Sequence, residues 1–304
     1  MVPMIERYLL RYFLAVVDNG NFSRAAQQVN VAQPTLSVGI TKLETELGVP
    51  LFERSSRRVS LTDAGTRLLE YARRIEGDFN EAERSVGDAK TQPIFRLGVL
   101  TTIPTQMITT ALKRALEIEP ESRVEIFEGN ERDISNLLSR GRIDAALTLV
   151  NRGGQRFNEV PLFEEGYAIA MPASHPLAGQ AIISAEDVAD NVMIVRRSCD
   201  VLSEVSKHFL DRGIRPFFAF RSNNDDRVLG LIAAGLGVTV LPESHTWEGV
   251  VLAKLAGFDL KRGIGFAYVS DIQSARIEQS PIGAALLETV SAADCPGLPA
   301  GSKR

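Results

Sequence analysis

Polar side chains lie at the start of one short predicted helix, where they could form hydrogen bonds with another macromolecule. In the stretch FSRAAQQVNVAQPTLSVGITKLETELG, residues 22–48, the second helical segment opens with Gln33, Pro34 and Thr35, and Ser37 follows. Amide and hydroxyl groups of this kind can read the edges of DNA bases. Almost no loop separates this segment from the helical pattern before it, so the two helices must cross at a steep angle.

Basic side chains accompany this segment. Arg54, Arg57 and Arg58 lie in the stretch PLFERSSRRVSLT, residues 50–62, and a guanidinium there could bind phosphate or enter a minor groove. Lys42, in the helical pattern before it, is a further candidate phosphate contact. The alternative for the arginines is an ordinary run of hydrated surface charge.

Three short helices are expected to position these groups, over residues 5–17, 22–29 and 33–47. Gly20 and Gly48 are placed to end the first and the third of them. Two short extended segments follow. This order predicts a winged helix-turn-helix, a motif that presents the N-terminal part of its second paired helix to the major groove of duplex DNA.

The next segment changes to one long charged helix with a regular apolar seam. Its apolar positions recur in alternating steps of four and three, at Leu68, Ala72, Ile75, Phe79, Ala82, Val86 and Ala89. Such a heptad repeat with charged flanks favours a coiled-coil dimer through residues 63–90. The alternative is an amphipathic helix that lies on its own domain.

From Pro93 onward, short strands alternate with helices. The expected strands are IFRLGVL, SRVEIF, IDAALTLV, YAIAMP, VMIV, PFFAF, GVTVLP, VVLAKL and GIGFAYV. The expected helices cover residues 105–118, 134–140, 185–189, 202–212, 226–234 and 277–290. This alternation predicts parallel, doubly wound α/β sheets in two lobes, with a ligand cleft between them.

The expected domains follow from these patterns. They are a winged helix-turn-helix over residues 1–62, a linker helix over 63–92 and a ligand-binding domain over 93–304, with lobe I from 93–162 and 268–304 and lobe II from 163–267. The α/β part is similar in kind to periplasmic binding proteins. A small-molecule binding protein or enzyme, with the N-terminal helices as a protein-interaction module, is therefore the rival interpretation.

Composition fits an ordinary folded protein of 304 residues, with 44% hydrophobic and 24% charged residues. The net charge is −4, yet residues 1–62 carry +2, which suits different partners at the two ends of the chain. No apolar run is long enough to span a bilayer, and the N-terminus lacks a signal-peptide pattern. Two cysteines fit a reducing compartment, so a cytoplasmic location without a membrane partner is expected.

The N-terminal sequence resembles the DNA-binding region of LysR-type transcriptional regulators. The residues that carry the resemblance within 5–66 are Ala25-Ala26, Gln33-Pro34, Ser37, Leu43-Glu44, Leu47-Gly48, Leu51-Phe52, Arg54, Leu61-Thr62 and Ala64-Gly65. HPLA at 175–178 and AAGLGVTVLP at 233–242 resemble the effector domain of that family. The resemblance implies an effector-controlled regulator that binds operator DNA as a homodimer or homotetramer, with RNA polymerase as a further candidate partner.

In that family the N-terminal part of the third helix reads bases. The resemblance therefore assigns the groove-facing positions to Gln33, Pro34, Thr35 and Ser37, with Gln33 on an adenine edge and Pro34 or Thr35 on a thymine methyl. Many relatives carry arginine directly after the serine, whereas this chain has Val38. Base reading that depends less on arginine is expected.

Candidate effector contacts lie after the strands of the α/β part. Thr101 and Thr102 stand between a strand and a helix, where they could bind an anionic ligand or simply cap the helix. The resemblance adds the turn at Asn130 and the segment at Ser198 and Cys199. Weaker candidates are Thr148, Asn223, Asn224, Arg196 and Arg197, the last two either as groups that could neutralise an anion or as solvated loop charges.

Cys199 raises the alternative of a thiol-based redox sensor, because some members of the family sense peroxide through a cysteine pair in this lobe. The second cysteine here, Cys295, lies near the end of the chain, so a buried or pocket-lining thiol is favoured instead. The three histidines lack metal-ligand spacing, and no catalytic or dinucleotide motif is present. We therefore expect no enzyme activity, no metal and no cofactor.

Overall fold

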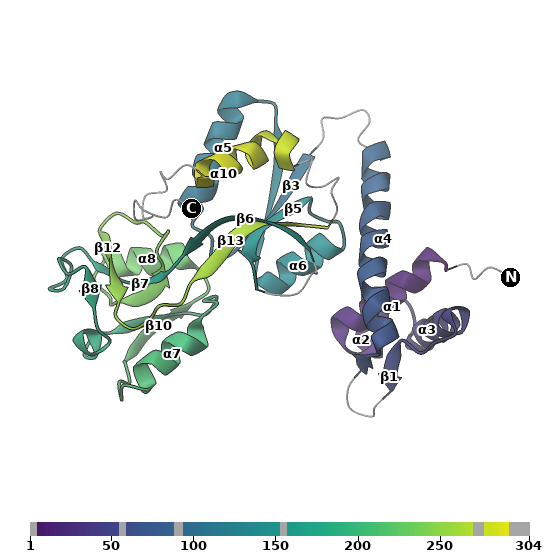
Figure 1. Ribbon diagram of the computed structural model, residues 1–304, viewed down its shortest axis with the longest axis horizontal. Coiled ribbons are helices and arrows are strands. Elements are labelled where there is room, and N and C mark those ends of the chain that lie inside the picture. The colour runs from purple at the N-terminus through teal and green to yellow at the C-terminus, as the bar shows by residue number, and fades with distance from the viewer. Residues whose placement is uncertain (1–4, 55–58, 88–93, 153–156, 270–276, 292–304) are drawn as a thin grey trace. The chain divides into compact units, whose positions relative to one another are not determined.

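A computed structural model of the chain describes residues 5–54, 59–87, 94–152, 157–269 and 277–291 (Figure 1). The chain forms two compact units. One comprises Met1–Gln92 with Asn136–Arg142, and the other comprises Pro93–Ser135 with Ile143–Arg304. Each unit is described by itself below.

Three helices and a two-stranded ribbon open the first unit. Their bounds are α1 Arg7–Asn19, α2 Phe22–Gln28, α3 Gln33–Leu47, β1 Phe52–Arg54 and β2 Val59–Leu61. Gly20 and Gly48 adopt the left-handed conformation that ends α1 and α3, as predicted. Asn21 begins α2, because its side chain accepts hydrogen bonds from the backbone N–H groups of Ser23 and Arg24.

Close approaches hold these short helices together. A Cβ atom on Gly39 would lie 2.6 Å from the ring of Tyr12, so only glycine lets α3 pack this closely on α1. The carboxylate of Glu44 accepts hydrogen bonds from the backbone N–H groups of Leu51 and Phe52, which ties the end of α3 to the start of the ribbon. These contacts fix the orientation of α3 within the winged unit.

The long helix α4, Asp63–Gly87, follows the ribbon directly. The hydroxyl of Thr62 accepts a hydrogen bond from Gly65 N and caps the helix. A Cβ atom on Gly65 would lie 2.2 Å from the carbonyl oxygen of Leu51, so the first turn of α4 needs glycine there. The helix is thereby joined tightly to the winged unit.

Arg7 links α1 to the middle of α4. Its guanidinium donates to the carboxylates of Glu76 at 2.8 Å and Glu83 at 2.7 Å, and to the amide oxygen of Asn80 at 2.9 Å. The same group lies 4.6 Å from the centre of the Phe79 ring. One arginine therefore contacts two turns of α4, which makes helix and winged unit a single body.

The predicted heptad seam of α4 divides into two parts. Ala72 is fully buried in the core of the winged unit. Beyond it, Ile75, Phe79 and Val86 are 37%, 46% and 77% exposed. Only the first half of α4 thus packs on its own domain, as the alternative interpretation had it. Ala89, the last residue of the predicted seam, lies outside the described residues.

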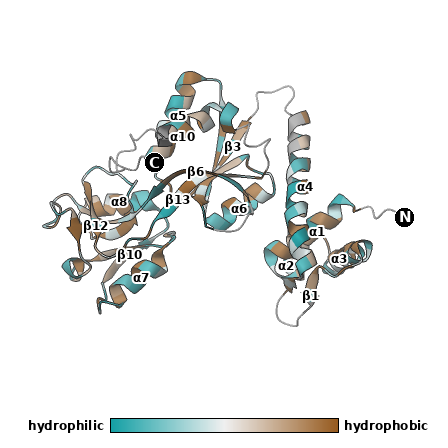
Figure 2. Cartoon of the chain, in the orientation of Figure 1, coloured by the Kyte–Doolittle hydropathy of each residue, from teal (hydrophilic) through white to brown (hydrophobic). Residues whose placement is uncertain are grey.

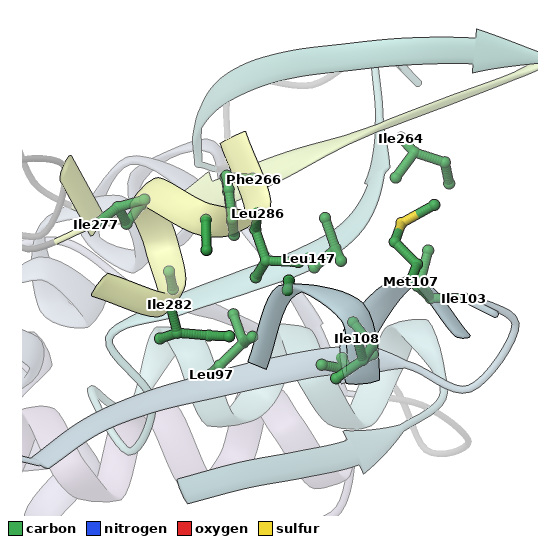
Figure 3. Close-up of a cluster of buried hydrophobic side chains, with 14 of the residues drawn as sticks. Leu97, Ile103, Met107, Ile108, Leu147, Ile264, Phe266, Ile277, Ile282 and Leu286 are labelled. Atoms are coloured by element: carbon green, nitrogen blue, oxygen red, sulfur yellow. The ribbon is translucent and has the colours of Figure 1, made fainter. Parts of the chain in front are cut away.

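The second unit begins with a five-stranded sheet in the order β4-β3-β5-β13-β6. Its strands are β3 Ile94–Leu100, β4 Arg123–Gly129, β5 Ala145–Val150, β6 Asn158–Glu165 and β13 Arg262–Tyr268. The helices α5 Thr105–Ile118 and α10 Pro281–Ser291 accompany it, and the helix α6 Glu131–Ser139 begins in this unit and ends in the first. Apolar side chains of β3, β5 and β13 form a core with α5 and α10, in which Leu97, Leu147, Phe266, Ile282 and Leu286 are fully buried (Figure 3).

The second lobe has a four-stranded sheet in the order β11-β7-β12-β8 and a two-stranded sheet of β10 and β9. Its elements are β7 Tyr167–Pro172, β8 Ile182–Ile183, a 3-10 turn Glu186–Val188, β9 Met193–Arg196, α7 Leu202–Leu210, β10 Phe218–Ser222, α8 Asp225–Ala233, β11 Thr239–Pro242 and β12 Val250–Leu255. The two lobes match the fold class predicted from the sequence.

The predicted parallel pairing is found between β3 and its neighbours β4 and β5, but it does not extend through the sheets. Strand β13 runs antiparallel to β5 and β6, and β7 runs antiparallel to both β11 and β12. The chain passes between the lobes at the ends of β6 and β13, which places these two strands side by side and in opposite directions. Strand β6 was not predicted from the sequence, and all but one of its residues are exposed or half-buried.

Hydropathy follows this layout. In Figure 2, α5 and α7 show both hydrophilic and hydrophobic residues, as helices do that pack one face on a core. Among the described residues, no helix combines the length and apolar content needed to cross a membrane.

Candidate nucleic-acid interface and ligand pocket

One face of α3 is buried and the opposite face is open. Leu36, Ile40 and Leu43 are at most 1% exposed and form the core of the winged unit. The predicted groove-facing residues Gln33, Pro34 and Thr35 are exposed, and Ser37 is half-buried. The leading turns of the helix thus offer polar and small side chains to a partner.

Val38 lies on this same open face and is 70% exposed. An aliphatic side chain so exposed gains little from its own subunit, and Val38 is not part of the core that Leu36 and Ile40 help to form. It follows Thr35 by one helical turn, so the two side chains are neighbours on the helix surface. From the sequence, Val38 was notable only because many relatives have an arginine at that position.

Lys42 is partly engaged within its own unit. Its ammonium group lies 2.5 Å from Glu6 Oε1 and donates to Tyr8 Oη at 3.3 Å. The bond to Glu6, with that to Tyr8, raises the pKa of Lys42. The side chain is charged and exposed, but a phosphate would have to compete with Glu6 for it.

Arg24 is a basic residue that the sequence analysis missed. It stands in the first turn of α2, fully on the surface, next to the capping Asn21. The first helix of a helix-turn-helix crosses the DNA backbone, so an exposed arginine here is placed to contact phosphate. The run NFSRAA, with a capping residue before the arginine, is the signal that could have found it. Arg57 and Arg58 lie outside the described residues, and only the backbone of Arg54, at the end of β1, is described.

A pocket of about 170 Å³ lies in the second unit where α5 and β4 of lobe I approach the start of α8 in lobe II. Thr101 and Asn224, both predicted from the sequence, line it together. Asn224 also caps α8 by accepting a hydrogen bond from Arg227 N at 2.7 Å. The described side chains that line the pocket are Val99, Leu100, Thr101, Ile103, Pro104, Thr105, Ile108, Thr109, Ile126, Glu128, Asn224, Asp225, Asp226 and His245.

Acidic groups of this pocket were missed by the sequence analysis. Asp226 accepts a hydrogen bond from the hydroxyl of Thr105 at 2.7 Å, which joins α8 to α5 across the pocket. Asp225, its neighbour, is 7% exposed, and Glu128 is exposed at the end of β4. The run NNDD before a helix pattern could have indicated them, but it also fits simple capping.

Asp225 belongs to a buried charged cluster. Its carboxylate accepts two hydrogen bonds from the guanidinium of Arg196, one of them 2.8 Å long. Burial acts to raise the pKa of Asp225, but the neighbouring His245 and Arg196 outweigh it and hold the pKa well below its usual range. The proposal from sequence that Arg196 neutralises an anionic ligand is wrong, because Arg196 is 2% exposed and neutralises Asp225.

His245 is buried beside this cluster with its ring nitrogens unsatisfied. It is 3% exposed, and neither nitrogen has a hydrogen-bond partner among the described residues. Its Nε2 lies 3.6 Å from Asp225 Oδ2. Burial lowers the pKa of His245, so the ring is neutral at pH 7.

The other predicted effector residues make internal contacts. Thr102 is buried and its hydroxyl accepts a hydrogen bond from Arg262 at 2.9 Å. Asn130 caps α6 by accepting a bond from Asp133 N, and Ser198 donates to the carbonyl oxygen of Asn223. Thr148, in β5, is 8% exposed. None of these four is among the described residues that line the pocket with Thr101.

Cys199 lines a different cavity. This second cavity, about 370 Å³, lies within lobe II between α7 and strands β9 and β10, and most of its lining is apolar. Arg215 and Arg221 are exposed residues that also line it. Burial raises the pKa of the Cys199 thiol, which keeps it protonated at pH 7.

The fold and these two sites define a ligand-responsive DNA-binding regulator: a winged helix-turn-helix whose third helix has an exposed face, joined to a two-lobed domain with a small pocket between the lobes. The family model described as "Bacterial regulatory helix-turn-helix protein, lysR family" matches residues 8–66. The model described as "LysR substrate binding domain" matches residues 89–279. The chain belongs to the LysR family of transcriptional regulators, which bind DNA and small-molecule effectors and form oligomers.

Similar proteins agree with this assignment. The HTH-type transcriptional regulator XapR of Escherichia coli (strain K12) is 31% identical over 81% of this chain and 86% of that protein. A hydrogen peroxide-inducible genes activator of Dickeya chrysanthemi is 30% identical over 85% and 88%. A solved full-length OxyR variant from Pseudomonas aeruginosa aligns with a TM-score of 0.56 at 25% identity, over 96% of each chain.

Proposed function

We propose that the chain regulates transcription by inserting the leading turns of α3 into the major groove of its operator. The observation that supports this most is the two-sided burial of α3, whose inner face forms the core while Thr35 and Val38 face outward. Gln33, Pro34, Thr35 and Ser37 then contact bases. Arg24, Lys42 and the arginines of the wing, Arg54, Arg57 and Arg58, bind phosphates or the minor groove.

Two copies are needed for tight binding. We assign the linker and dimerisation role to residues 63–92 and the reading role to residues 1–62, because the exposed stripe of Ile75, Phe79 and Val86 needs a cover and a second α4 supplies the same heptad spacing. Two winged units on one dimer read a dyad-related site, and their joint binding raises the affinity through effective concentration.

The effector binds in residues 93–304, in the pocket that Thr101 and Asn224 line. A ligand there touches α5 of one lobe and α8 of the other, so it binds most tightly when the lobes hold one arrangement. The protein acts by binding rather than by catalysis, and its site of action is the cytoplasm, because its target is chromosomal DNA. The ligand selects an arrangement of the domains that changes how the dimer fits its half-sites.

Thiol-based redox sensing at Cys199 is the second candidate, supported by the similarity to proteins such as the hydrogen peroxide-inducible genes activator of Dickeya chrysanthemi. The raised pKa of Cys199 argues against it, since the thiolate is the form that peroxide attacks. Alkylation by iodoacetamide in a Cys295→Ser variant separates the two, because a sensing thiol reacts at pH 7 far faster than a buried protonated one.

A mobility-shift titration with DNA that flanks the chain's own gene tests the proposal. We expect binding that weakens with salt, with a log–log slope of about −0.9 per phosphate contacted. Arg24→Ala removes one contact and makes the slope less steep by about 0.9. Arg123→Ala removes the same charge from an exposed position in lobe I and leaves the slope unchanged. Equal slopes for the wild type and Arg24→Ala would contradict the assignment of α2.

A further inference from the structure

The pocket between α5 and α8 is negatively charged, which has a consequence for its ligand. Glu128 and Asp226 both line it, and none of the described residues that line it is a lysine or an arginine. The third carboxylate, Asp225, is neutralised by Arg196. A net charge of about −2 therefore surrounds the pocket, and an anion would be repelled from it.

We propose that the effector is a small organic cation, such as an amine or amidine with an apolar part; this inference rests on the proposed function, which places the effector in this pocket. It reverses the expectation of an anionic ligand that the sequence suggested for Thr101 and Thr102. The hydroxyl groups at the start of α5 are already used: that of Thr105 donates to Asp226, and that of Thr102 accepts from Arg262.

His245 gives independent support for a ligand in this place. A buried imidazole without a partner is costly, because burial removes the water that would otherwise satisfy its nitrogens. Asp225 Oδ2 lies 3.6 Å from Nε2, beyond hydrogen-bond distance, so a polar group on the ligand is the partner that the ring lacks. In the neutral ring the proton is favoured on Nε2, which faces Asp225, so Nδ1 is left as an acceptor, and a carboxylate ligand could offer it no donor.

The volume and the apolar lining of the pocket limit the size of the ligand and indicate that part of it is apolar. The volume of about 170 Å³ equals that of about six water molecules at ~30 Å³ each, which is enough for one small ring. Leu100, Ile103, Pro104 and Ile108 give the lobe I wall an apolar surface. No group of three or more His, Cys, Asp or Glu side chains within the described ranges is placed to hold a metal ion, so an organic cation fits better than a metal.

Three isosteric probes test this inference directly: benzamidine, benzamide and benzoate have the same shape and carry charges of +1, 0 and −1. Thermal melting of the full-length protein is recorded at equal concentrations of each. A ligand that binds only the folded state raises the Tm. We expect the Tm to rise most with benzamidine, less with benzamide and least with benzoate.

Charge-removing variants locate the effect. Asp226→Asn and Glu128→Gln should each weaken benzamidine binding about tenfold, since each removes a charged acceptor. Glu121→Gln removes a similar exposed charge of lobe I that does not line the pocket, and should leave the benzamidine shift unchanged. A benzoate shift that equals or exceeds that of benzamidine overturns the inference, as does the absence of any benzamidine shift or one that both pocket variants retain. DNA binding is measured separately on the same protein, so a failed charge preference leaves the mobility-shift result intact.

Discussion

Arg262, at the start of β13, donates from Nη1 to the hydroxyl of Thr102 at 2.9 Å and from Nη2 to the Thr102 carbonyl oxygen at 3.0 Å. The same guanidinium forms a 2.8 Å ion pair with Glu165 at the end of β6, and Nη1 lies 3.7 Å from Asp200 of lobe II. Tyr167 donates to Asp200 at 2.6 Å. One buried arginine therefore joins the turn after β3 to both passages between the lobes.

Replacing Arg262 should strongly destabilise the ligand-binding domain. Arg262→Ala leaves the fully buried carboxylate of Glu165 without its counter-charge, which costs about 3–5 kcal/mol. Urea unfolding monitored by the fluorescence of Trp247, the single tryptophan, measures the change. Arg215→Ala, at an exposed position, is the control and should stay within about 0.5 kcal/mol of wild type. Equal effects of the two variants would show that the buried network contributes nothing.

Stability should fall in mild acid because of buried histidine. Burial lowers the pKa of His245 in the folded state, so the folded protein binds fewer protons than the unfolded chain near its ordinary pKa of about 6.5. The free energy of unfolding therefore decreases as the pH falls below about 6.5, by at most about 1.4 kcal/mol per pH unit for one proton.

His245→Gln removes this contribution. Burial lowers the pKa of His208 as well, so the free energy of unfolding of the variant should still decrease with falling pH, but less steeply than that of wild type. Asp225 plays no part between pH 5 and 7.5, because its stabilising contribution is lost only below about pH 4. Unfolding curves at several pH values in this window give the slopes. A slope in the variant as steep as that of wild type would contradict the neutral, buried state of His245.

The exposed stripe on α4 should control self-association. Ile75→Asp places a charge in the centre of the proposed seam and should shift the protein toward monomer in light scattering at micromolar concentration. Thr66→Asp introduces the same charge on an exposed residue of the same helix outside the stripe, and should leave the mass unchanged. An Ile75→Asp protein of wild-type mass would place the dimer contact elsewhere.

Val38 should read thymine through its methyl group. Replacing one operator thymine by deoxyuridine removes a single methyl, and at the base next to Val38 this should weaken wild-type binding about fourfold, the value of one buried carbon at about 0.8 kcal/mol. With Val38→Ala the same replacement should have no effect. A loss of equal size in both proteins, at every thymine tested, would mean that Val38 touches no methyl group.

Periodicity and capping residues predicted much of the fold. The helix predicted over residues 105–118 is α5 with the same bounds, and the helix predicted over 33–47 is α3, because both have clear apolar faces and defined ends. Strand direction was not predictable in this way: β13 is antiparallel to its neighbours through pairings with strands about 100 residues earlier, which local patterns do not encode.

The candidate sites were predictable only in part. Thr101 and Asn224 were predicted because they follow strands and precede helices, and the structure brings both to one pocket, while their effector role stays a prediction. Arg196 was misjudged because the sequence does not show that Asp225 would neutralise it inside the fold. His245 gave no signal, since its meaning comes from burial and from the partner that it lacks.

The most direct test of the account is the affinity for operator DNA of two glutamate variants on α3. Thr35→Glu places a negative charge on the open leading face of the helix, and Thr45→Glu places the same charge on an exposed residue near its end. If the leading turns enter the major groove, Thr35→Glu weakens binding by at least about a hundredfold, because a like charge against DNA costs several kcal/mol, and Thr45→Glu has a far smaller effect. Equal losses in the two variants, or none in Thr35→Glu, would contradict the account.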